Sequence, residues 1–322
     1  MKLRTIAAAW KGMARALAPA AAIATALLTA PAAEAGTSFI VQCDGAYKPI
    51  QFTSFKAGYH SANDDPIVFP GQPGASHLHE FFGNSTTDAF STFESLQGKQ
   101  HSCAAPDDYA GYWQPRIWKD GESYLPDYVR TYYGRGAAPA RYQLVWPPSG
   151  FKLVGTNRSY SCGAATPGDA ANARTAPYDC ATPGQKWLGG DDSKDGLVSR
   201  VIFPQCWDGD GIEPSDFHYG SCATTLGEKW IPMLRMGVHT NILGASPANI
   251  TFGSFPGEMD ETHLHADFLD GWVRTTILDL VTRCLNTQPN KCLAFVGSKV
   301  GDGGTPPAPP SPPPPAAARA HP

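Results

Sequence analysis

Blocks of like charge are missing from this chain, and only 17% of its residues are charged. Surfaces that bind nucleic acid or anionic membranes need clustered Lys and Arg, so the composition excludes an electrostatic partner of either kind. Apolar runs of about 20 residues, the length that spans a bilayer, are also missing beyond the N-terminal leader. We therefore expect no nucleic-acid partner and no membrane span.

Several catalytic signatures are missing as well. The chain contains no G-x-S-x-G elbow, no P-loop, no H-E-x-x-H and no G-x-G-x-x-G after a strand pattern. It also contains no C-x-x-C pair, which argues against a zinc–thiolate cluster. A common hydrolase, nucleotide-binding or zinc-finger mechanism is not indicated.

The N-terminus has the layout of a secretory signal. A basic leader precedes an apolar run over residues 16–28, and Ala33-Glu34-Ala35 fits the small-x-small cleavage pattern. The run of about 13 residues is too short to span a bilayer, which counts against an uncleaved anchor helix. We predict a signal peptide over 1–35 and a secreted, extracellular or cell-wall-associated protein. Removing four basic and one acidic residue changes the formal charge from -4 to -7.

All eight cysteines follow the leader, and an even count in an exported chain predicts a complete disulfide set. Such a set leaves no thiol nucleophile. Eight cysteines allow about 105 connectivities, so the sequence does not fix the pairing. One hypothesis pairs neighbours: Cys43–Cys103, Cys162–Cys180, Cys206–Cys222 and Cys284–Cys292.

Residues 36–302 are predicted to form one globular β-rich domain. Short β-branched and aromatic runs bounded by Gly and Pro are typical of strands, for example 51–55, 142–146, 151–154 and 197–203. Helical spacing from Val273 to Leu285 predicts one helix, with Asp270 or Asp267 as its cap. The expected architecture is a monomeric β-sandwich or jelly roll with a few helices, stapled by disulfides. Residues 303–322 are expected to be a disordered proline-rich tail.

Two segments nearly repeat each other. Ser76-His77-Leu78-His79-Glu80 resembles Thr262-His263-Leu264-His265, which Asp267 follows two positions later. On a strand, residues i and i+2 share a face, so each pair can present two imidazoles to one point. Two such strands predict a site for one divalent metal ion, zinc or copper, with His77, His79, His263 and His265 as ligands. Glu80 and Asp267 would add ligands or an acid and base.

Two other interpretations of the paired histidines stay open. In one, a metal-free site uses His and a carboxylate to move protons or to hold sugar hydroxyls. In the other, the histidines are hydrogen-bonded core or rim residues. His218, further along the chain, is a candidate for an additional ligand or proton carrier.

A further group of residues is suited to binding sugar. Ten of the chain's Tyr and Trp residues fall between Tyr109 and Trp146, and amphipathic rings suit carbohydrate faces. Most of them are expected in the sheet core, where such rings are also enriched. The candidates for a binding groove are Tyr112, Trp113, Trp118, Trp207 and Asp208. The Asp-x-Asp-Gly string at Asp208 is an incomplete calcium loop and is predicted to be a turn.

The ordered motifs resemble the secreted fungal and actinobacterial proteins of the domain of unknown function 1996 family. The motifs are Asp65-Pro66-Ile67-Val68-Phe69-Pro70-Gly71, Ser76-His77-Leu78-His79, Tyr112-Trp113-Gln114-Pro115, Phe203-Pro204-Gln205-Cys206-Trp207 and His265-Ala266-Asp267-Phe268. The resemblance implies an extracellular, often wall-associated setting and supplies no activity. The family's final motif usually has one His, matching His265, so it does not support His263.

The leading functional expectation is action on extracellular or cell-wall polysaccharide, by a hydrolase or lyase mechanism. His77, His79, His265 and Asp267 would form the site, with Glu80, His218 and His263 nearby. The alternatives are a non-catalytic glycan-binding or wall-attachment protein and an extracellular metal-capture protein.

Overall fold

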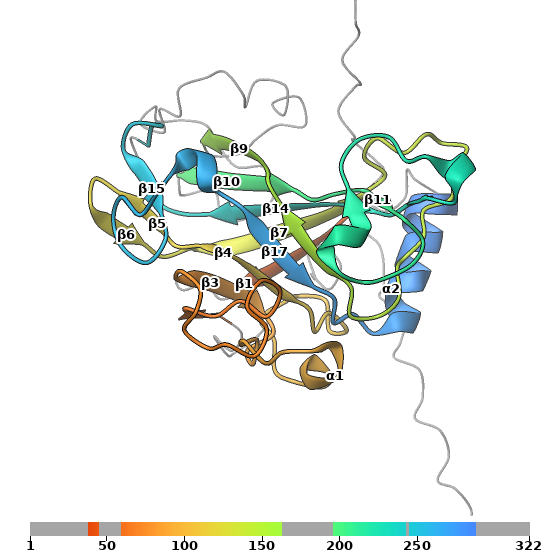
Figure 1. The fold of residues 1–322 in the computed structure, drawn as a ribbon, viewed down its shortest axis with the longest axis horizontal. Coiled ribbons are helices and arrows are strands. Elements are labelled where there is room, and N and C mark those ends of the chain that lie inside the picture. The colour runs from red at the N-terminus through yellow and green to blue at the C-terminus, as the bar shows by residue number, and fades with distance from the viewer. Residues whose placement is uncertain (1–37, 45–58, 163–195, 243–244, 288–322) are drawn as a thin grey trace, which may run out of the picture. The chain divides into compact units, whose positions relative to one another are not determined.

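The computed structural model describes residues 38–44, 59–162, 196–242 and 245–287. Two five-stranded antiparallel sheets dominate these residues (Figure 1). The first sheet has the order β1 (Ser38–Asp44), β7 (Tyr128–Gly134), β14 (Met233–His239), β10 (Leu197–Ile202) and β9 (Asn157–Cys162). The second has the order β2 (His60–Ala62), β3 (His79–Gly83), β4 (Gly111–Pro115), β17 (Ala266–Leu269) and β8 (Lys152–Gly155).

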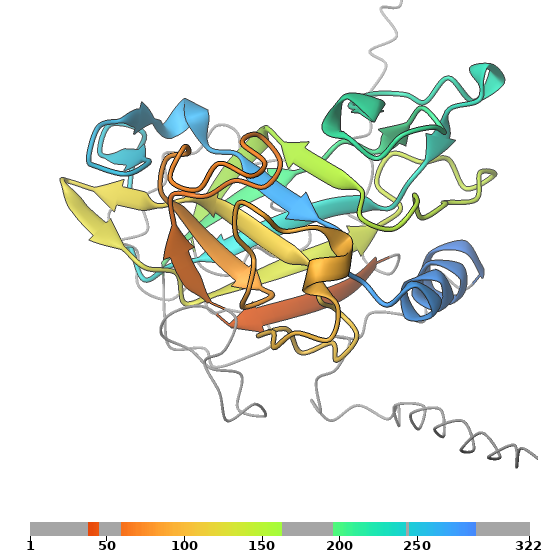
Figure 2. The same cartoon turned by 60° about the horizontal axis from the view of Figure 1, so that its bottom comes forward.

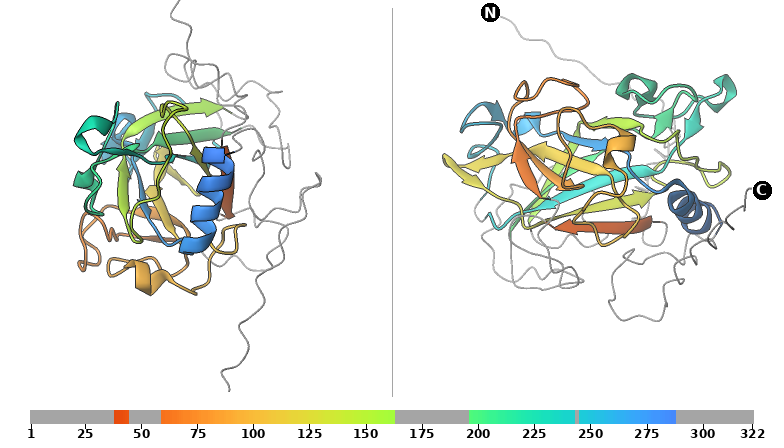
Figure 3. Two further views of the ribbon diagram at one scale, coloured as in Figure 1. Left: turned by 90° about the vertical axis from the view of Figure 1, so that its right-hand side faces the viewer. Right: turned by 90° about the horizontal axis from the view of Figure 1, so that it is seen from below.

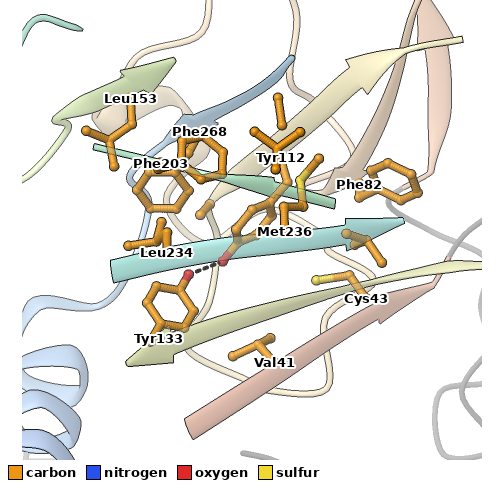
Figure 4. Packing of buried hydrophobic residues seen from close by; sticks show 14 of the residues in the cluster. Val41, Cys43, Phe82, Tyr112, Tyr133, Leu153, Phe203, Leu234, Met236 and Phe268 are labelled. Carbon is orange, nitrogen blue, oxygen red and sulfur yellow. Dashed lines mark hydrogen bonds between the residues drawn. The ribbon is translucent and has the colours of Figure 1, made fainter. Parts of the chain in front are cut away.

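The two sheets share one hydrophobic core, as a β-sandwich does. Phe39, Val41 and Cys43 alternate inward on β1, which places one face of the first sheet in this core. Tyr112 and Phe268 enter the same core from the second sheet (Figure 4). The hydroxyls of Tyr112 and Tyr133 meet across the core at 2.5 Å. The expectation of a mainly β, disulfide-stapled fold is confirmed.

Two smaller sheets and a few helices complete the described elements. One sheet contains β16 (Met259–Asp260), β15 (Ile250–Phe252), β5 (Ile117–Lys119) and β6 (Glu122–Tyr124), and the other contains β12 (Phe217–His218), β11 (Cys206–Trp207) and β13 (Lys229–Trp230). The helices are α1 (Phe93–Leu96), α2 (Arg274–Leu280), three 3-10 turns (Pro214–Asp216, Thr224–Leu226 and Glu261–His263) and a π-helical segment (Val281–Thr287). Figure 3 shows α2 from two further directions, at the end of the first sheet. Among the described residues, none of the helices has the length and hydropathy to cross a bilayer.

The predicted helix forms, but its predicted cap is wrong. Val273 is the N-cap of α2 and makes no side-chain cap hydrogen bond. Asp270 instead accepts hydrogen bonds from the backbone N–H groups of Gly150 and Trp272, and Asp267 lies within β17. Of the predicted strands, 151–154 and 197–203 correspond to β8 and β10, whereas 142–146 is irregular and 51–55 lies outside the described residues.

Two of the predicted disulfides are present. Cys43–Cys103 links β1 to the segment that follows α1, and Cys206–Cys222 closes the loop beyond β11. The other two proposed pairs each include a cysteine outside the described residues, Cys180 or Cys292.

The second sheet uses both of its faces. Because side chains alternate along a strand, Phe82, Tyr112 and Phe268 point into the shared core while their chain neighbours point to the opposite, outer face. A second small core of Phe81, Leu96, Trp113 and Leu269 covers part of that outer face. The outer face also carries the histidines singled out by the sequence.

Candidate metal centre

Three imidazoles from two distant parts of the chain meet on this outer face. The ring centroids of His77 and His79 are 4.3 Å apart, and that of His265 lies 5.0 Å from His77 and 5.6 Å from His79. His79 begins β3, and His265 directly precedes β17. These strands flank β4, so sheet pairing brings together residues that are far apart in sequence. Figure 2 shows the 60–83 segment beside the 250–270 segment.

Backbone carbonyls orient two of the rings. The Nδ1 atom of His79 lies 2.9 Å from the carbonyl oxygen of Asp64, and that of His265 lies 2.9 Å from the carbonyl oxygen of His263. A carbonyl oxygen only accepts, so each Nδ1 carries the hydrogen and each Nε2 keeps its lone pair when the ring is neutral. This is the arrangement that metal-binding histidines commonly have.

The two lone pairs face each other. The Nε2 atoms of His79 and His265 are 3.4 Å apart, and a direct hydrogen bond between them needs one ring to be charged or its tautomer reversed. Zinc–nitrogen bonds of about 2.0–2.1 Å at tetrahedral angles place two ligand nitrogens about 3.3–3.4 Å apart. The observed separation therefore fits two ligands of one tetrahedral ion.

His77 supplies a third nitrogen. Its Nε2 is buried and has no hydrogen-bond partner in the described part of the chain. One nitrogen from each of the three rings lies within 4.8 Å of the others, close enough to share an ion. Three His ligands with an open position are typical of catalytic zinc sites.

Burial keeps these rings neutral. Desolvation, reinforced by the neighbouring His265, lowers the pKa of His77 to about 4. Desolvation is also the largest cause of the lowered pKa of His265 and of the strongly lowered pKa of His79. A metal ligand must be unprotonated, so all three rings are ready to bind near neutral pH.

Two carboxyl groups lie next to the imidazoles. The Oδ2 atom of Asp267 is 3.8 Å from Nε2 of His265, and Asp65, His79 and Asp267 form a second group with ligand atoms within 4.8 Å. Neither oxygen of Asp267 has a hydrogen-bond partner among the described residues, although the side chain is buried. Burial, and then the charge of Asp65, raise the pKa of Asp267 well above its ordinary value. A buried carboxyl group without partners is costly unless a proton or a cation satisfies it.

The residues of the site differ in their exposure to solvent. His79 and Asp267 are fully buried, whereas His77 is half-buried and the side chain of His265 is 20% exposed. A molecule from solvent would therefore reach the imidazoles past His77 and His265, with Asp267 on the inner side.

Three other sequence candidates lie apart from this group. His263 is exposed on a 3-10 turn, and its ring contacts Asp260, so only its carbonyl serves His265. Glu80 points to the opposite face of β3, where it pairs with Arg116 and accepts a hydrogen bond from Ser61. The imidazole of His218 lies 3.1 Å from the Glu228 carboxylate on the small β11–β13 sheet.

The aromatic candidates are mostly interior. Tyr112 and Trp113 are fully buried, and Trp207 is nearly so, with Lys229 over its ring. Trp118 is half-buried and donates a hydrogen bond from Nε1 to the carbonyl oxygen of Gly253. Asp208 is exposed and accepts a hydrogen bond from the N–H of Asp210, which agrees with the predicted turn.

Sequence reasoning missed Asp65 as a site residue. Its Oδ1 accepts hydrogen bonds from the N–H groups of Ile67 and Val68, and its carboxyl group lies near His79 and Asp267. No spacing relates Asp65 to either histidine segment, so only its place in the family motif singled it out. Two further groups of potential ligands, around Cys43 and Cys206, contain disulfide-bonded cysteines and therefore offer no thiolate.

The fold and the site define a mainly β protein with a three-histidine cluster on the outer face of one sheet. The chain belongs to the family described as "Domain of unknown function (DUF1996)", whose sequence profile matches residues 65–272, more than half of the chain. The matched span contains all three imidazoles together with Asp65 and Asp267. No curated protein and no solved structure matches the chain.

Proposed function

We propose that this chain is a secreted metalloprotein that acts on extracellular polysaccharide, with His77, His79 and His265 as the metal ligands. The observation that carries the metal centre is the 3.4 Å separation of the Nε2 atoms of His79 and His265. Nitrogen ligands of this kind suit a borderline divalent ion, zinc before copper. The signal sequence and the disulfides support an oxidising, extracellular location.

Each part of the site has a role in this proposal. A divalent ion held by the three imidazoles would polarise a bound water molecule or a substrate oxygen. Asp267 lies on the inner side of the imidazoles and acts as the acid–base group, because it is close to His265 and has no competing hydrogen-bond partner among the described residues. Burial, and then the negative charge of Asp65, raise the pKa of Asp267, which favours the protonated form of this acid–base group.

Metal analysis and turnover together test the proposal. Protein purified without an affinity tag is expected to contain about one equivalent of zinc or copper, and His265→Ala and His79→Ala are expected to lose it. Polysaccharide incubated with the native protein is expected to release soluble sugars, and both variants are expected to release none. His263→Ala is the matched control, because only the backbone carbonyl of His263 contacts the site.

The possible outcomes separate the alternatives. Metal binding without any release of sugar would support metal capture, and binding to insoluble glycan without product would support a non-catalytic glycan-binding protein. Metal-free protein whose variants keep full glycan turnover would contradict the metal centre.

A further inference from the structure

The tip between β15 and β16 is fastened to the metal-binding segment. The hydroxyl of Ser254 accepts hydrogen bonds from the N–H of Leu78, at 2.9 Å, and from the amide of Asn63, at 3.1 Å. Leu78 lies between the two histidines of the first pair. The tip is therefore held beside the segment that carries His77 and His79.

A second set of contacts fixes the base of the same tip. Trp118 donates from Nε1 to the carbonyl oxygen of Gly253, and the N–H of Gly253 donates to the carbonyl oxygen of Arg116. Glu258 accepts a hydrogen bond from the N–H of Ser254, which folds its side chain over the tip. The tip is thus a defined feature of the fold.

The tip presents one aromatic ring and one carboxylate to solvent. Phe255 is 58% exposed, so its ring is accessible to a ligand from solvent. Glu258 is exposed and lies close enough to His77 for its charge to act on that ring. Phe255 and Glu258 belong to one turn, closed by a hydrogen bond from the N–H of Glu258 to the carbonyl oxygen of Phe255. A ring face attracts cations and a carboxylate pairs with them, so this turn can hold a cationic group.

The surroundings of the site are strongly acidic. Residues 59–98 and 250–273, which supply the ligands and the tip, contain ten Asp and Glu residues and no Lys or Arg. The neighbouring cation, Arg116, is paired with Glu80 on the opposite face of β3. Asp267 is one of these ten and is fully buried, so the negative charge at the mouth comes from exposed groups such as Glu258. The potential at the mouth of the site favours cations and repels anions.

We propose that the substrate is a glycan with free amino groups, an N-unsubstituted hexosamine chain, that lies on Phe255 with an ammonium group at Glu258. The inference rests on the proposed function for the chemistry of the site and adds the substrate class. A uronate or sulfated chain would bring like charge to the acidic rim. A neutral or fully N-acetylated chain would gain the stacking contact with Phe255 and lose the ionic contact with Glu258.

Equilibrium binding of three soluble probes tests this inference. The probes are hexamers of glucosamine, N-acetylglucosamine and galacturonate, titrated at mildly acidic pH, where the amino group is charged and His77, with a pKa of about 4, is still neutral. The glucosamine hexamer is expected to bind about tenfold or more tightly than the galacturonate hexamer, and added salt is expected to weaken it. The N-acetylglucosamine hexamer is expected to bind between these two.

Two variants examine the tip itself. Glu258→Gln is expected to weaken glucosamine-hexamer binding about two- to fivefold, as for an exposed ion pair, and Phe255→Ala is expected to weaken it by a similar factor. Asp279→Asn removes the same charge from the exposed surface of α2 and is the matched control, expected to leave binding unchanged. All three variants are expected to keep the metal content of the native protein.

Several results would overturn the inference. They are equal affinity for the three hexamers, preference for galacturonate, and a loss in Glu258→Gln no larger than the loss in Asp279→Asn. Metal binding is measured on the same samples, so the two proposals fail separately. A metal-loaded chain without amino-sugar preference contradicts only the substrate class, and a metal-free chain with Glu258-dependent binding contradicts only the metal centre.

Discussion

The Nε2 atoms of His79 and His265 lie 3.4 Å apart although 186 positions separate the two residues along the chain. The orientation of each ring depends on contacts beyond its own side chain. Each ring is turned by a hydrogen bond from Nδ1 to a backbone carbonyl, and β4 holds the two strands at the required spacing.

Zinc is expected to stabilise the folded chain. At a zinc concentration of one hundred times Kd, binding adds about 2.7 kcal/mol to the free energy of unfolding. For a chain of this size that corresponds to a rise in Tm of about 5–10 °C. His265→Ala is expected to abolish the rise and His263→Ala to keep it, as measured by thermal unfolding with and without zinc. An equal rise in both variants would place the ion elsewhere.

Zinc affinity is expected to persist into mildly acidic solution. The imidazoles must be neutral to bind, and burial lowers the pKa of His77 from 6.5 to about 4. Titrations at a series of pH values should give nearly constant affinity down to about pH 5 and a steep loss near pH 4. In the metal-free chain, the lowered pKa of His77 contributes stability that is present above pH 6.5 and is lost as the pH falls towards 4. A loss of zinc affinity centred near the ordinary histidine pKa would contradict the burial argument.

Asp267→Asn is expected to change metal binding and stability in opposite directions. Burial and Asp65 raise the pKa of Asp267, so folding without metal must neutralise or desolvate its carboxyl group. The amide has no charge to desolvate, and the metal-free variant should be more stable at neutral pH, by on the order of 1 kcal/mol. Zinc affinity should fall about 10- to 100-fold, as for loss of a group that supports a metal site. Urea unfolding and zinc titration of the same variant measure both effects.

Asp108→Asn is expected to protect the fold at alkaline pH. Burial raises the pKa of Asp108 to about 8 from 3.8, and its Oδ2 lies 2.7 Å from the hydroxyl of Tyr112. The folded chain holds this proton more tightly than the unfolded chain. The contribution of the Asp108 proton to the free energy of unfolding is therefore complete below pH 3.8 and is lost as the pH rises through 8.

The measurement for Asp108 is the free energy of unfolding across that range. The advantage of Asp108→Asn over the native chain should grow with pH, by at most about 1.4 kcal/mol per pH unit. Asp270 is also buried, with a pKa raised to about 7, so part of the native pH dependence should remain in this variant. A difference that stays constant with pH would show that Asp108 is ionised in the folded chain.

Removing the Cys206–Cys222 disulfide is expected to lower stability without affecting the metal centre. The two cysteines are 16 positions apart, and cross-links of that span contribute about 3 kcal/mol. The Cys206→Ala/Cys222→Ala double variant should unfold at lower urea concentration and bind zinc with native affinity. Weaker zinc binding would show that the β11–β13 sheet supports the histidine cluster.

Local patterns in the sequence predicted part of the fold. Short β-branched and aromatic runs bounded by Gly and Pro predicted β8 and β10, and helical spacing predicted the helix that begins at Arg274. The expected strand at 142–146 is irregular although its composition is typical of a strand. Its backbone hydrogen bonds go to several distant groups, such as the amide of Asn286 and the backbone of Trp230, and local propensity contains no information on these partners.

The site was predicted only in part, because local spacing identifies candidate ligands but not which distant segments meet. The H-x-H spacing identified His77, His79 and His265, although only His79 lies in a strand, at the start of β3, and His77 precedes that strand by two positions. His263 has the same spacing from His265, but a 3-10 turn replaces the strand there and directs its ring to Asp260. The nearness of Asp65 depends on the path of the chain before β3, which no local pattern encodes.

The main-chain carbonyls that turn the histidine rings have a consequence for how this centre tolerates change. The Nδ1 atoms donate to the backbone carbonyl oxygens of residues 64 and 263, so these two hydrogen bonds do not involve the side chain of either residue. A substitution at either position that preserves the backbone course would still offer the same two nitrogens. The course of the backbone thus sets the orientation of the rings. A substitution at position 64 or 263 would disturb that orientation only by altering the fold.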